Sequence, residues 1–372
     1  MPLPPFLRAL RSDYFFHGLL ATLALLTAFG SAKIATYATL VDWPTIATLA
    51  GLLLLTKSLE MSGCLTHLGT MLIARLPSER LLALFLVAAT ALLSMVLTND
   101  VALFVVVPLT IGLRATLSLP TVRLVVFEAL AANAGSAFTP IGNPQNLFLW
   151  QFSHSGFAAY CLAMLPLLLI VMLLLAALCF VAFPALRIVV QTQAESAPVN
   201  KVWMWVAMLL YLPFLVCADL HHAFAALCII GVTFLVLGRR VLVQTDWGLI
   251  LVFVLMFIDL RLVAQLPQVQ GAILAIGLAD PVRLYFSGIV ASQLISNVPA
   301  AILLAEYSKD WRMIAYAVNI GGFGFVMGSL ANIIALRLVR ERAAWVVFHL
   351  YSIPFLFASA ALGYLYLFFL QG

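Results

Sequence analysis

The sequence predicts an all-α polytopic membrane protein made of two inverted-topology repeats, each with a re-entrant hairpin and a broken helix. Composition is the first indication, because the 372 residues are 65% hydrophobic and 9% charged, against about 25% charged in a soluble domain. The second is a repeat of polar motifs, and the third is where the basic residues fall between apolar stretches. Composition also excludes disordered, collagen-like and nucleic-acid-binding chains.

Apolar stretches account for most of the chain. At about 20 residues per helical crossing, they predict about 9–11 transmembrane helices. The longest clearly polar stretch, 191–201, is expected to be a loop, so little sequence is left for a water-soluble domain. The first apolar run follows two arginines, as in a signal peptide, but we expect an uncleaved helix because the later sequence is also apolar. The stretches are 14–30, 43–73, 81–113, 122–150, 159–186, 202–218, 223–238, 247–265, 284–305, 313–336 and 344–370.

Basic residues predict the topology, because cytoplasmic loops are enriched in Lys and Arg. The chain has 19 basic and 14 acidic residues, a net charge of +5. If every basic cluster is cytoplasmic, 81–113 enters from the cytoplasm and returns to it. The stretch 284–305 then enters and leaves on the outside, between Arg283 and Lys309. The N-terminus is then cytoplasmic and the C-terminus periplasmic, in a bacterial inner membrane. The clusters are Arg8/Arg11, Arg75/Arg80, Arg114/Arg123, Arg187/Lys201, Arg239/Arg240 and Arg337/Arg340/Arg342.

An internal repeat supports the same topology. Val-Asp-Trp at 41–43 recurs as Thr-Asp-Trp at 245–247, each time before a hydrophobic run. The hairpins carry related tips, Thr98-Asn99-Asp100 and Ser296-Asn297-Val298, which start 198 residues apart. After each hairpin comes Asn-x-Gly-x6-Gly-x3-Asn, from Asn133 to Asn146 and from Asn319 to Asn332, at a constant offset of 186.

These features divide the chain into five parts. They are an N-terminal helix (1–40), a first repeat (41–150, hairpin about 81–113 and broken helix about 122–150), connecting helices (151–244), a second repeat (245–340, hairpin about 284–305 and broken helix about 313–336) and a C-terminal helix (341–372).

The polar residues at the tips and breaks predict a binding site. Inverted repeats whose broken helices meet near the bilayer midplane are typical of secondary transporters, and unwound backbone in a membrane is tolerated only around a cavity or ion. Neutral oxygens suit sodium, while half-helix N-termini favour an anion. The alternative is that the Asn and Ser side chains only bond neighbouring helices. The candidate residues for substrate or ion binding are Thr98, Asn99, Asp100, Asn133, Ser136, Thr139, Gly142, Asn143, Asn146, Ser296, Asn297, Asn319, Gly322, Gly328, Ser329 and Asn332, with sodium at Thr98, Asn99 and Asp100 and at Ser296 and Asn297.

Four ionisable residues inside predicted spans are expected to pair. Ionisable groups in a bilayer are costly and are usually paired or functional. Lys57 and Glu60 are three residues apart on one helix and can pair. Asp259 and Arg261 occupy the equivalent region of the second half, where a pair across the two repeats is possible but its partners do not follow from the sequence; a structural pairing is expected for them as well.

Two further carboxyl groups, those of Asp100 and Glu128, lie close to the tips and breaks. Asp100 lies on a hairpin tip, where a carboxylate can ligate a cation or carry a proton; its rival role is a permanent salt bridge to Lys57 or Arg261. Glu128 lies two turns before the first break and can be either a proton carrier or a helix-end charge.

The hairpin tips and the two Asn-x-Gly stretches resemble the ion transporter superfamily. It includes citrate-transporter-like proteins, divalent anion–sodium symporters, arsenite permeases and some sodium–proton antiporters. The likeness covers about residues 41–340, and the whole chain is similar to the YbiR-type branch of bacterial inner-membrane transporters. In the symporters each tip reads Ser-Asn-Thr and helps to hold sodium; here both asparagines are kept and both third positions differ. Asn99-Asp100 and Gly328-Ser329-Leu330-Ala331 are more similar to arsenite permeases.

The resemblance implies a scaffold and a transport domain, often dimeric, with an elevator-like movement. The leading hypothesis is a secondary active transporter of a small anion or oxyanion, coupled to sodium or protons. The alternative is a sodium–proton antiporter or an arsenite or metalloid exporter. A channel would need a continuous polar path. No P-loop, His-Glu-x-x-His or Gly-x-Ser-x-Gly motif occurs, so we expect no enzyme and no cofactor. The expected partners are the anionic substrate, membrane lipids and a second copy of the chain, and no nucleic acid.

Overall fold

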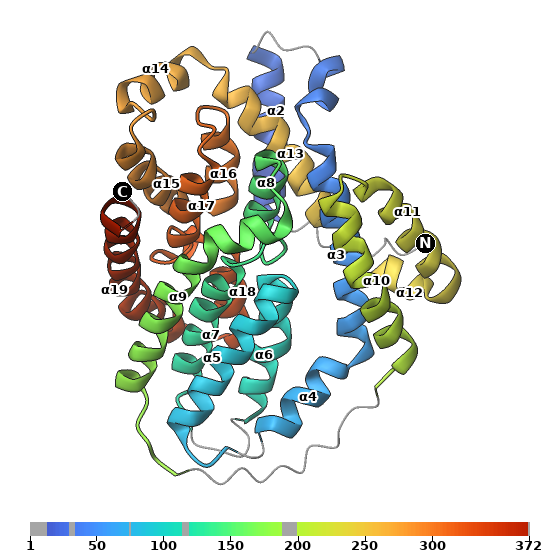
Figure 1. The fold of residues 1–372 in the computed structure, drawn as a ribbon, viewed down its shortest axis with the longest axis vertical. Helices are drawn as coiled ribbons and strands as arrows, with labels where there is room; N and C mark the ends of the chain where they lie inside the picture. Colours follow the sequence, from blue (N-terminus) through green and yellow to red (C-terminus); the bar gives the residue numbers. More distant parts are fainter. Residues whose placement is uncertain (1–12, 30–33, 74–75, 114–118, 188–198, 371–372) are drawn as a thin grey trace.

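The computed structural model describes residues 13–29, 34–73, 76–113, 119–187 and 199–370 (Figure 1). Within these ranges the chain is helical, with one isolated bridge between Ser78 and Arg187 and no strand. The all-α prediction is therefore confirmed for these residues. Four of the arginines used for the topology lie outside them: Arg8, Arg11, Arg75 and Arg114.

The helices follow the order of the apolar stretches. The first half contains α2 (Tyr14–Phe29), η1 (Ile34–Leu40), α3 (Trp43–Ser62), α4 (Cys64–Ile73), α5 (Glu79–Val96), α6 (Asn99–Leu113), α7 (Thr121–Ser136), α8 (Pro144–Ser153) and α9 (Phe157–Ala182). The second contains α10 (Lys201–Asp219), α11 (Ala223–Leu237), α12 (Arg239–Gln244), α13 (Trp247–Ala264), α14 (Pro267–Ile276), α15 (Pro281–Ile295), α16 (Asn297–Ala305), α17 (Trp311–Ile320), η2 (Val326–Gly328), α18 (Leu330–Val339), α19 (Ala343–Leu365) and η3 (Tyr366–Leu370).

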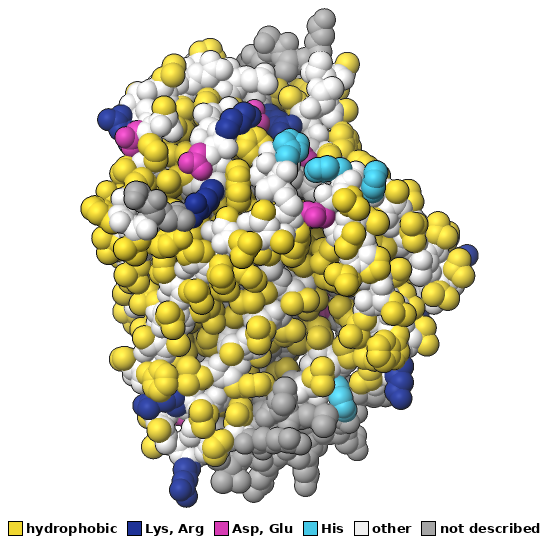
Figure 2. Space-filling view, in the orientation of Figure 1, with side chains coloured by type: hydrophobic (Ala, Val, Ile, Leu, Met, Phe, Trp, Pro, Cys, Tyr) yellow, Lys and Arg dark blue, Asp and Glu magenta, His cyan; other side chains and the backbone are white. Residues whose placement is uncertain are grey.

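Several helices are suited to a membrane. Of the described helices, α5, α9, α10, α13 and α19 with η3 are long and apolar enough to cross one, and η1 with α3 forms a sixth candidate bent by 65°. Figure 2 shows apolar side chains across the middle of the molecule, with most charged side chains towards its two ends. The chain is thus a polytopic membrane protein. The full number of 9–11 crossings stays a prediction, and the shorter apolar helices α2, α6, α11 and α18 are candidates for the remainder.

The starts of α5 and α7 lie at one basic end of the molecule. Arg80 Nε donates to Phe183 O (2.9 Å), and Arg123 donates to Ala182 O (2.7 Å), so both starts lie beside the end of α9. This end is at the bottom of Figure 1, whereas the turn between α16 and α17, which carries Lys309, lies in its upper part.

Two helical hairpins open towards these opposite ends. Helices α5 and α6 pack on each other, turn at 97–98 and return to the bottom of Figure 1, while α15 and α16 turn at Ser296 and open upwards. Ser296 has a φ of 73°, a conformation that is uncommon for any residue but glycine. Its carbonyl accepts from Ala300 N (3.1 Å) and its N–H donates to Ser292 O (3.0 Å), so backbone bonds on both sides hold the turn.

Two helices are interrupted where the repeated motifs predict it. The first chain segment leaves α7 after Ser136 and enters α8 at Pro144, and the second leaves α17 after Ile320 and enters α18 at Leu330. Both interruptions lie within the stretches where broken helices are predicted. Helix α6 packs on α18, and α16 packs on α8, so each hairpin also contacts the second part of the other interrupted helix. This packing brings the two breaks, 137–143 and 321–329, together.

Candidate functional site

Glycines allow the backbone to fold back on itself at both breaks. A Cβ at Gly142 would lie 2.4 Å from Ser136 O, and one at Gly328 would lie 2.5 Å from Gly321 O. Real Cβ atoms do not approach so closely, so neither position accepts a side chain without a backbone shift. The two glycines are 186 residues apart and so occupy equivalent positions in the repeat. At both breaks, a glycine therefore allows the close approach of a backbone carbonyl.

The first cluster of amides joins the end of α7 to the start of α18. Asn133 Nδ2 donates to Asn332 Oδ1 (2.8 Å), and Ser329 Oγ donates to Asn133 Oδ1 (2.9 Å). Asn332 Nδ2 in turn donates to Gly322 O (2.9 Å). All four residues belong to the predicted site, and their bonds connect the first break to the second.

The second cluster has the same bonds with the halves exchanged. Asn319 Nδ2 donates to Asn146 Oδ1 (2.7 Å), and Asn143 Nδ2 donates to Asn319 Oδ1 (3.1 Å). Asn146 Nδ2 donates to Ser136 O (2.9 Å). Each of these bonds has a counterpart in the first cluster at the offset of 186 residues. The repeat seen in the sequence is therefore also a repeat of contacts.

These amides are buried and largely satisfied by one another. Asn133 and Asn319 are each 3% exposed, and Asn146 and Asn332 are 0% exposed. Buried polar side chains normally have such partners, because an unpaired one loses its bonds to water without replacement. The arrangement gives the four asparagines a positioning role: they hold the two breaks in register beside the hairpin tips.

The first tip lies against the first break. The N–H of Asn99 donates to Gly142 O (2.9 Å), and Asn99 Oδ1 accepts from the N–H of Asp100 (3.0 Å). Thr139 Oγ1 donates to Met95 O (2.6 Å), one turn before the tip. Thr98 and Asn99 are 7% and 4% exposed, so their neutral oxygens are shielded from bulk water. Oxygens of this kind are suitable ligands for a hard cation such as sodium.

The second tip lies against the second break, where sequence reasoning missed one residue. Asn297 Nδ2 is 3.2 Å from the point that a Cβ of Gly322 would occupy. Gln293, near the end of α15, was not expected to take part, yet its Nε2 donates to Gly321 O (2.5 Å) and to Phe323 O (2.9 Å). Its Oε1 accepts from the N–H of Phe325 (2.8 Å). The sequence did offer one indication of this role, because Gln293 is a polar residue in an apolar helix, one turn before the tip.

The ionisable residues are paired only in part. Lys57 Nζ contacts Glu60 Oε1 at 3.0 Å, which confirms the pairing expected from their spacing. Arg261 Nε contacts Glu306 Oε1 at 2.9 Å, and its Nη1 donates to Leu40 O (2.7 Å). Within the described ranges neither cation pairs with Asp100, so the rival salt-bridge role is not found there.

The expected pairing fails for Asp259. Both of its carboxylate oxygens are buried without a hydrogen-bond partner among the described residues. Residues i and i+2 do not face each other on a helix, so Arg261 projects away from Asp259 and reaches Glu306 instead.

The chain resembles known membrane transporters. Residues 16–310 match the family model described as CitMHS, citrate transporter. The chain is 44% identical to the inner membrane protein YbiR of Escherichia coli over 363 residues, 98% of each chain. It is 32% identical over 302 residues to an uncharacterized transporter of Methanocaldococcus jannaschii, covering 80% of this chain and 82% of the relative. A shorter match, 34% identical over 129 residues, covers 35% of this chain and 27% of the silicon efflux transporter LSI3 of Oryza sativa subsp. japonica.

Proposed function

Because the chain belongs to the citrate transporter family, we propose that it is a secondary active transporter that moves a small anion or oxyanion, driven by sodium or protons. The observation that carries this proposal is that two interrupted helices meet at their breaks. Equivalent hydrogen bonds between side-chain amides join the two breaks, and a hairpin tip contacts each break. Such breaks are where secondary transporters bind substrate and coupling ions.

The two halves act as inverted-topology repeats with re-entrant hairpins. Two observations support this arrangement: the hairpins point in opposite directions in Figure 1, and the hydrogen bonds between side-chain amides are equivalent in the two halves. The basic end then faces the cytoplasm by the excess of Lys and Arg in cytoplasmic loops, and the N-terminus is cytoplasmic while the C-terminus is periplasmic. An inner-membrane location agrees with the Escherichia coli relative. An elevator-like movement and a homodimer belong to the same proposal.

Helix N-termini favour an anionic substrate. Four helices begin at the tips and breaks: α6 at Asn99, α8 at Pro144, α16 at Asn297 and α18 at Leu330. Each N-terminus carries a partial positive charge of about half an elementary charge, which favours an anion. At the start of α6 the N–H groups of Asn99 and Asp100 already have partners. The breaks 137–143 and 321–329 contain no Lys or Arg. The anion is therefore bound by N–H groups, hydroxyls and amides.

A neutral metalloid hydroxide exporter is the second candidate. Binding by hydroxyls and amides, without Lys or Arg at the breaks, suits an uncharged hydroxide as well. The match to a silicon efflux transporter over 129 residues favours the same class. In that case the chain exports its substrate in exchange for a coupling ion, rather than importing an anion with one.

Ligand-dependent thermal stability tests the binding site. Purified protein is heated with citrate, other dicarboxylates, phosphate, sulfate, arsenite or silicic acid, each with and without sodium and at several pH values. A ligand at 100 times its Kd stabilises by about 2.7 kcal/mol. We expect one class of ligand to raise the Tm of the wild type and not of Asn99→Ala or Asn297→Ala. Asn200→Ala, which removes the N-cap of α10, is the matched control. Equal shifts in all variants would contradict a site at the tips.

A further inference from the structure

Glu128 is a buried carboxyl group that the proposed substrate site does not use. It lies in the middle of α7 and is 0% exposed, so it is not a charge at a helix end. The hydroxyl of Thr110, on α6, donates to its Oε1. Its Oε2 is buried and has no hydrogen-bond partner within the part of the chain that the structure describes.

The surroundings of Glu128 are apolar. Its neighbours on α7 belong to a buried cluster shared with α6, α18 and α19, including Leu103, Val125, Ala129 and Ala335. Among the described residues no cation pairs with Glu128. The titratable or charged side chains on the elements packed against α7 are Glu79 and Arg80 (α5), Asp100 (α6), Arg337 (α18), Tyr160, Cys161 and Cys179 (α9) and His349, Tyr351 and Tyr364 (α19), with Arg123 on α7 itself.

Charge at this position lacks compensation. An ionised carboxylate in an apolar interior is costly unless it is paired and fully hydrogen-bonded. Glu128 has one hydroxyl donor and no counter-ion among the described residues. The neutral acid removes the charge and can donate its own proton to the hydroxyl oxygen of Thr110. The geometry therefore suits a group that holds a proton.

We propose that Glu128 is a proton-binding site, occupied by a proton in this conformation, and that this proton couples to movement of the first hairpin. The proposal rests on the proposed transport function and names its coupling ion. Glu128 links α6, which begins at the tip residue Asn99, to α7, which carries Asn133 at the first break. Loss of the proton places a charge between these helices. That charge favours separation of α6 from α7 or entry of water, and either change moves the tip relative to the break.

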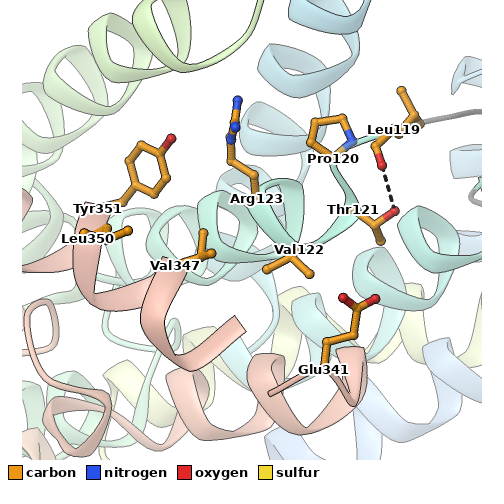
Figure 3. Close-up of a pocket in the computed structure, with 9 residues that line it drawn as sticks. All are labelled: Leu119, Pro120, Thr121, Val122, Arg123, Glu341, Val347, Leu350 and Tyr351. Carbon is orange, nitrogen blue, oxygen red and sulfur yellow. Dashed lines mark hydrogen bonds between the residues drawn. The ribbon is translucent and has the colours of Figure 1, made fainter. Parts of the chain in front are cut away.

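A cavity lies at the start of α7, at the basic end of the molecule. It has a volume of about 390 Å³ and is lined by Thr121, Arg123, Glu341 and Tyr351, among others (Figure 3). Thr121 and Glu128 are seven residues apart, which places them on one face of α7, about 10 Å apart along its axis. The buried residues between them, including Leu124, close this route in the present conformation. Protons therefore reach Glu128 from the basic end only when α7 and its neighbours separate.

Infrared spectroscopy of the purified protein in lipid tests the protonation directly. We expect a protonated-carboxyl band at neutral pH that shifts in D₂O and loses one component in Glu128→Gln; the buried carboxyl group of Asp259 can supply a second component, which this variant should keep. Thr110→Val should shift the band, because the hydrogen-bond partner is gone. The matched control is Glu60→Gln: Glu60 is paired with Lys57 at 3.0 Å, and its removal should leave the band unchanged. A band unchanged in Glu128→Gln, or absent from the wild type at every pH at which it is folded, would overturn the proposal.

The pH dependence of stability gives a second readout. If folded Glu128 keeps a proton that the unfolded chain releases above about pH 4–5, the folded state binds more protons and the free energy of unfolding falls as pH rises. Glu128→Gln should show a smaller fall, and an equal fall would oppose the proposal. If Glu128→Gln does not fold, Glu128→Asp and Thr110→Val supply the comparison. A wild type with the band but without transport of any tested solute supports the proton site and contradicts the transport function.

Discussion

Replacing Asn319 with alanine removes side-chain hydrogen bonds that connect the two breaks. In the wild type, Asn319 Nδ2 donates to Asn146 Oδ1 (2.7 Å) and Asn319 Oδ1 accepts from Asn143 Nδ2 (3.1 Å). After the change, Asn146 Oδ1 is left buried with no described partner, whereas Asn143 Nδ2 keeps its bond to Ser136 Oγ (3.0 Å). Asn146 Oδ1 therefore loses its hydrogen bond without replacement, whereas Asn143 Nδ2 keeps one partner.

The expected loss follows from these two atoms. A buried acceptor left unpaired costs about 1–3 kcal/mol, and the net loss of one further hydrogen bond costs about 1 kcal/mol. Asn319→Ala should thus lower the free energy of unfolding by about 2–4 kcal/mol. Because the first cluster has equivalent hydrogen bonds, Asn133→Ala should lower the free energy of unfolding by a similar amount.

A double-mutant cycle measures the interaction between Asn319 and Asn146. The free energy of unfolding is measured by reversible chemical denaturation in mixed micelles for Asn319→Ala, Asn146→Ala and the double variant. We expect a coupling energy of about 1–2 kcal/mol, because the two side chains contact each other. Asn319→Ala combined with Asn200→Ala is the control, and its two effects should add within about 0.5 kcal/mol. Additive effects for Asn319 and Asn146 would refute the idea that their bond joins the halves.

Further substitutions test the first break, the two tips and the carboxyl group of Asp100 at the first tip. Gly142→Ala should lower stability by more than about 2 kcal/mol and slow uptake, because its Cβ would meet a carbonyl oxygen at 2.4 Å. Gly231→Ala, inside helix α11 with no atom within 4 Å, should leave stability unchanged or raise it by up to about 1 kcal/mol; equal Tm values for the two variants would contradict this. Asn99→Ala and Asn297→Ala should each abolish uptake into vesicles with folding retained, and full activity in both would remove the tips from the site. If Asp100 ligates a cation or carries a proton, Asp100→Asn should alter the sodium or pH dependence of uptake and change stability by no more than about 1 kcal/mol; an unchanged dependence with a large loss of Tm would contradict this role.

The interrupted helices could be predicted because their signals are local. Gly135 and Gly142 with Pro140 and Pro144 mark a helix that stops and restarts, and the same glycine spacing recurs 186 residues later. Glycine and proline act through the backbone of their own segment. The break was therefore visible without knowledge of any partner.

The partners of the asparagines were not predictable, because they come from the other half of the chain. The spacing makes Asn133 equivalent to Asn319 and Asn146 equivalent to Asn332. It does not show that Asn133 and Asn332 meet, because only the packing of α7 on α18 brings their amides to 2.8 Å. Gln293 was missed because it breaks the repeat: the residue 198 positions before it is Met95, whose backbone carbonyl, not its side chain, contacts Thr139.

Asp259 shows a second limit of sequence reasoning. Its neighbour Arg261 has a long side chain that can reach several elements, and sequence spacing does not say which. In the fold it reaches Glu306 and Leu40 O, both distant in sequence, and leaves the carboxylate of Asp259 without a partner among the described residues.

Uptake into proteoliposomes tests most directly whether the two breaks form one transport site. The purified protein is reconstituted into proteoliposomes that contain no solute, and accumulation of the labelled solute is followed under an imposed sodium or proton gradient. We expect saturable accumulation that depends on one gradient, is lost in both Asn99→Ala and Asn297→Ala, and is retained in Asn200→Ala. Flux that rises linearly with concentration and ignores both gradients, or accumulation that survives in both tip variants, would contradict a gradient-driven site between the hairpin tips.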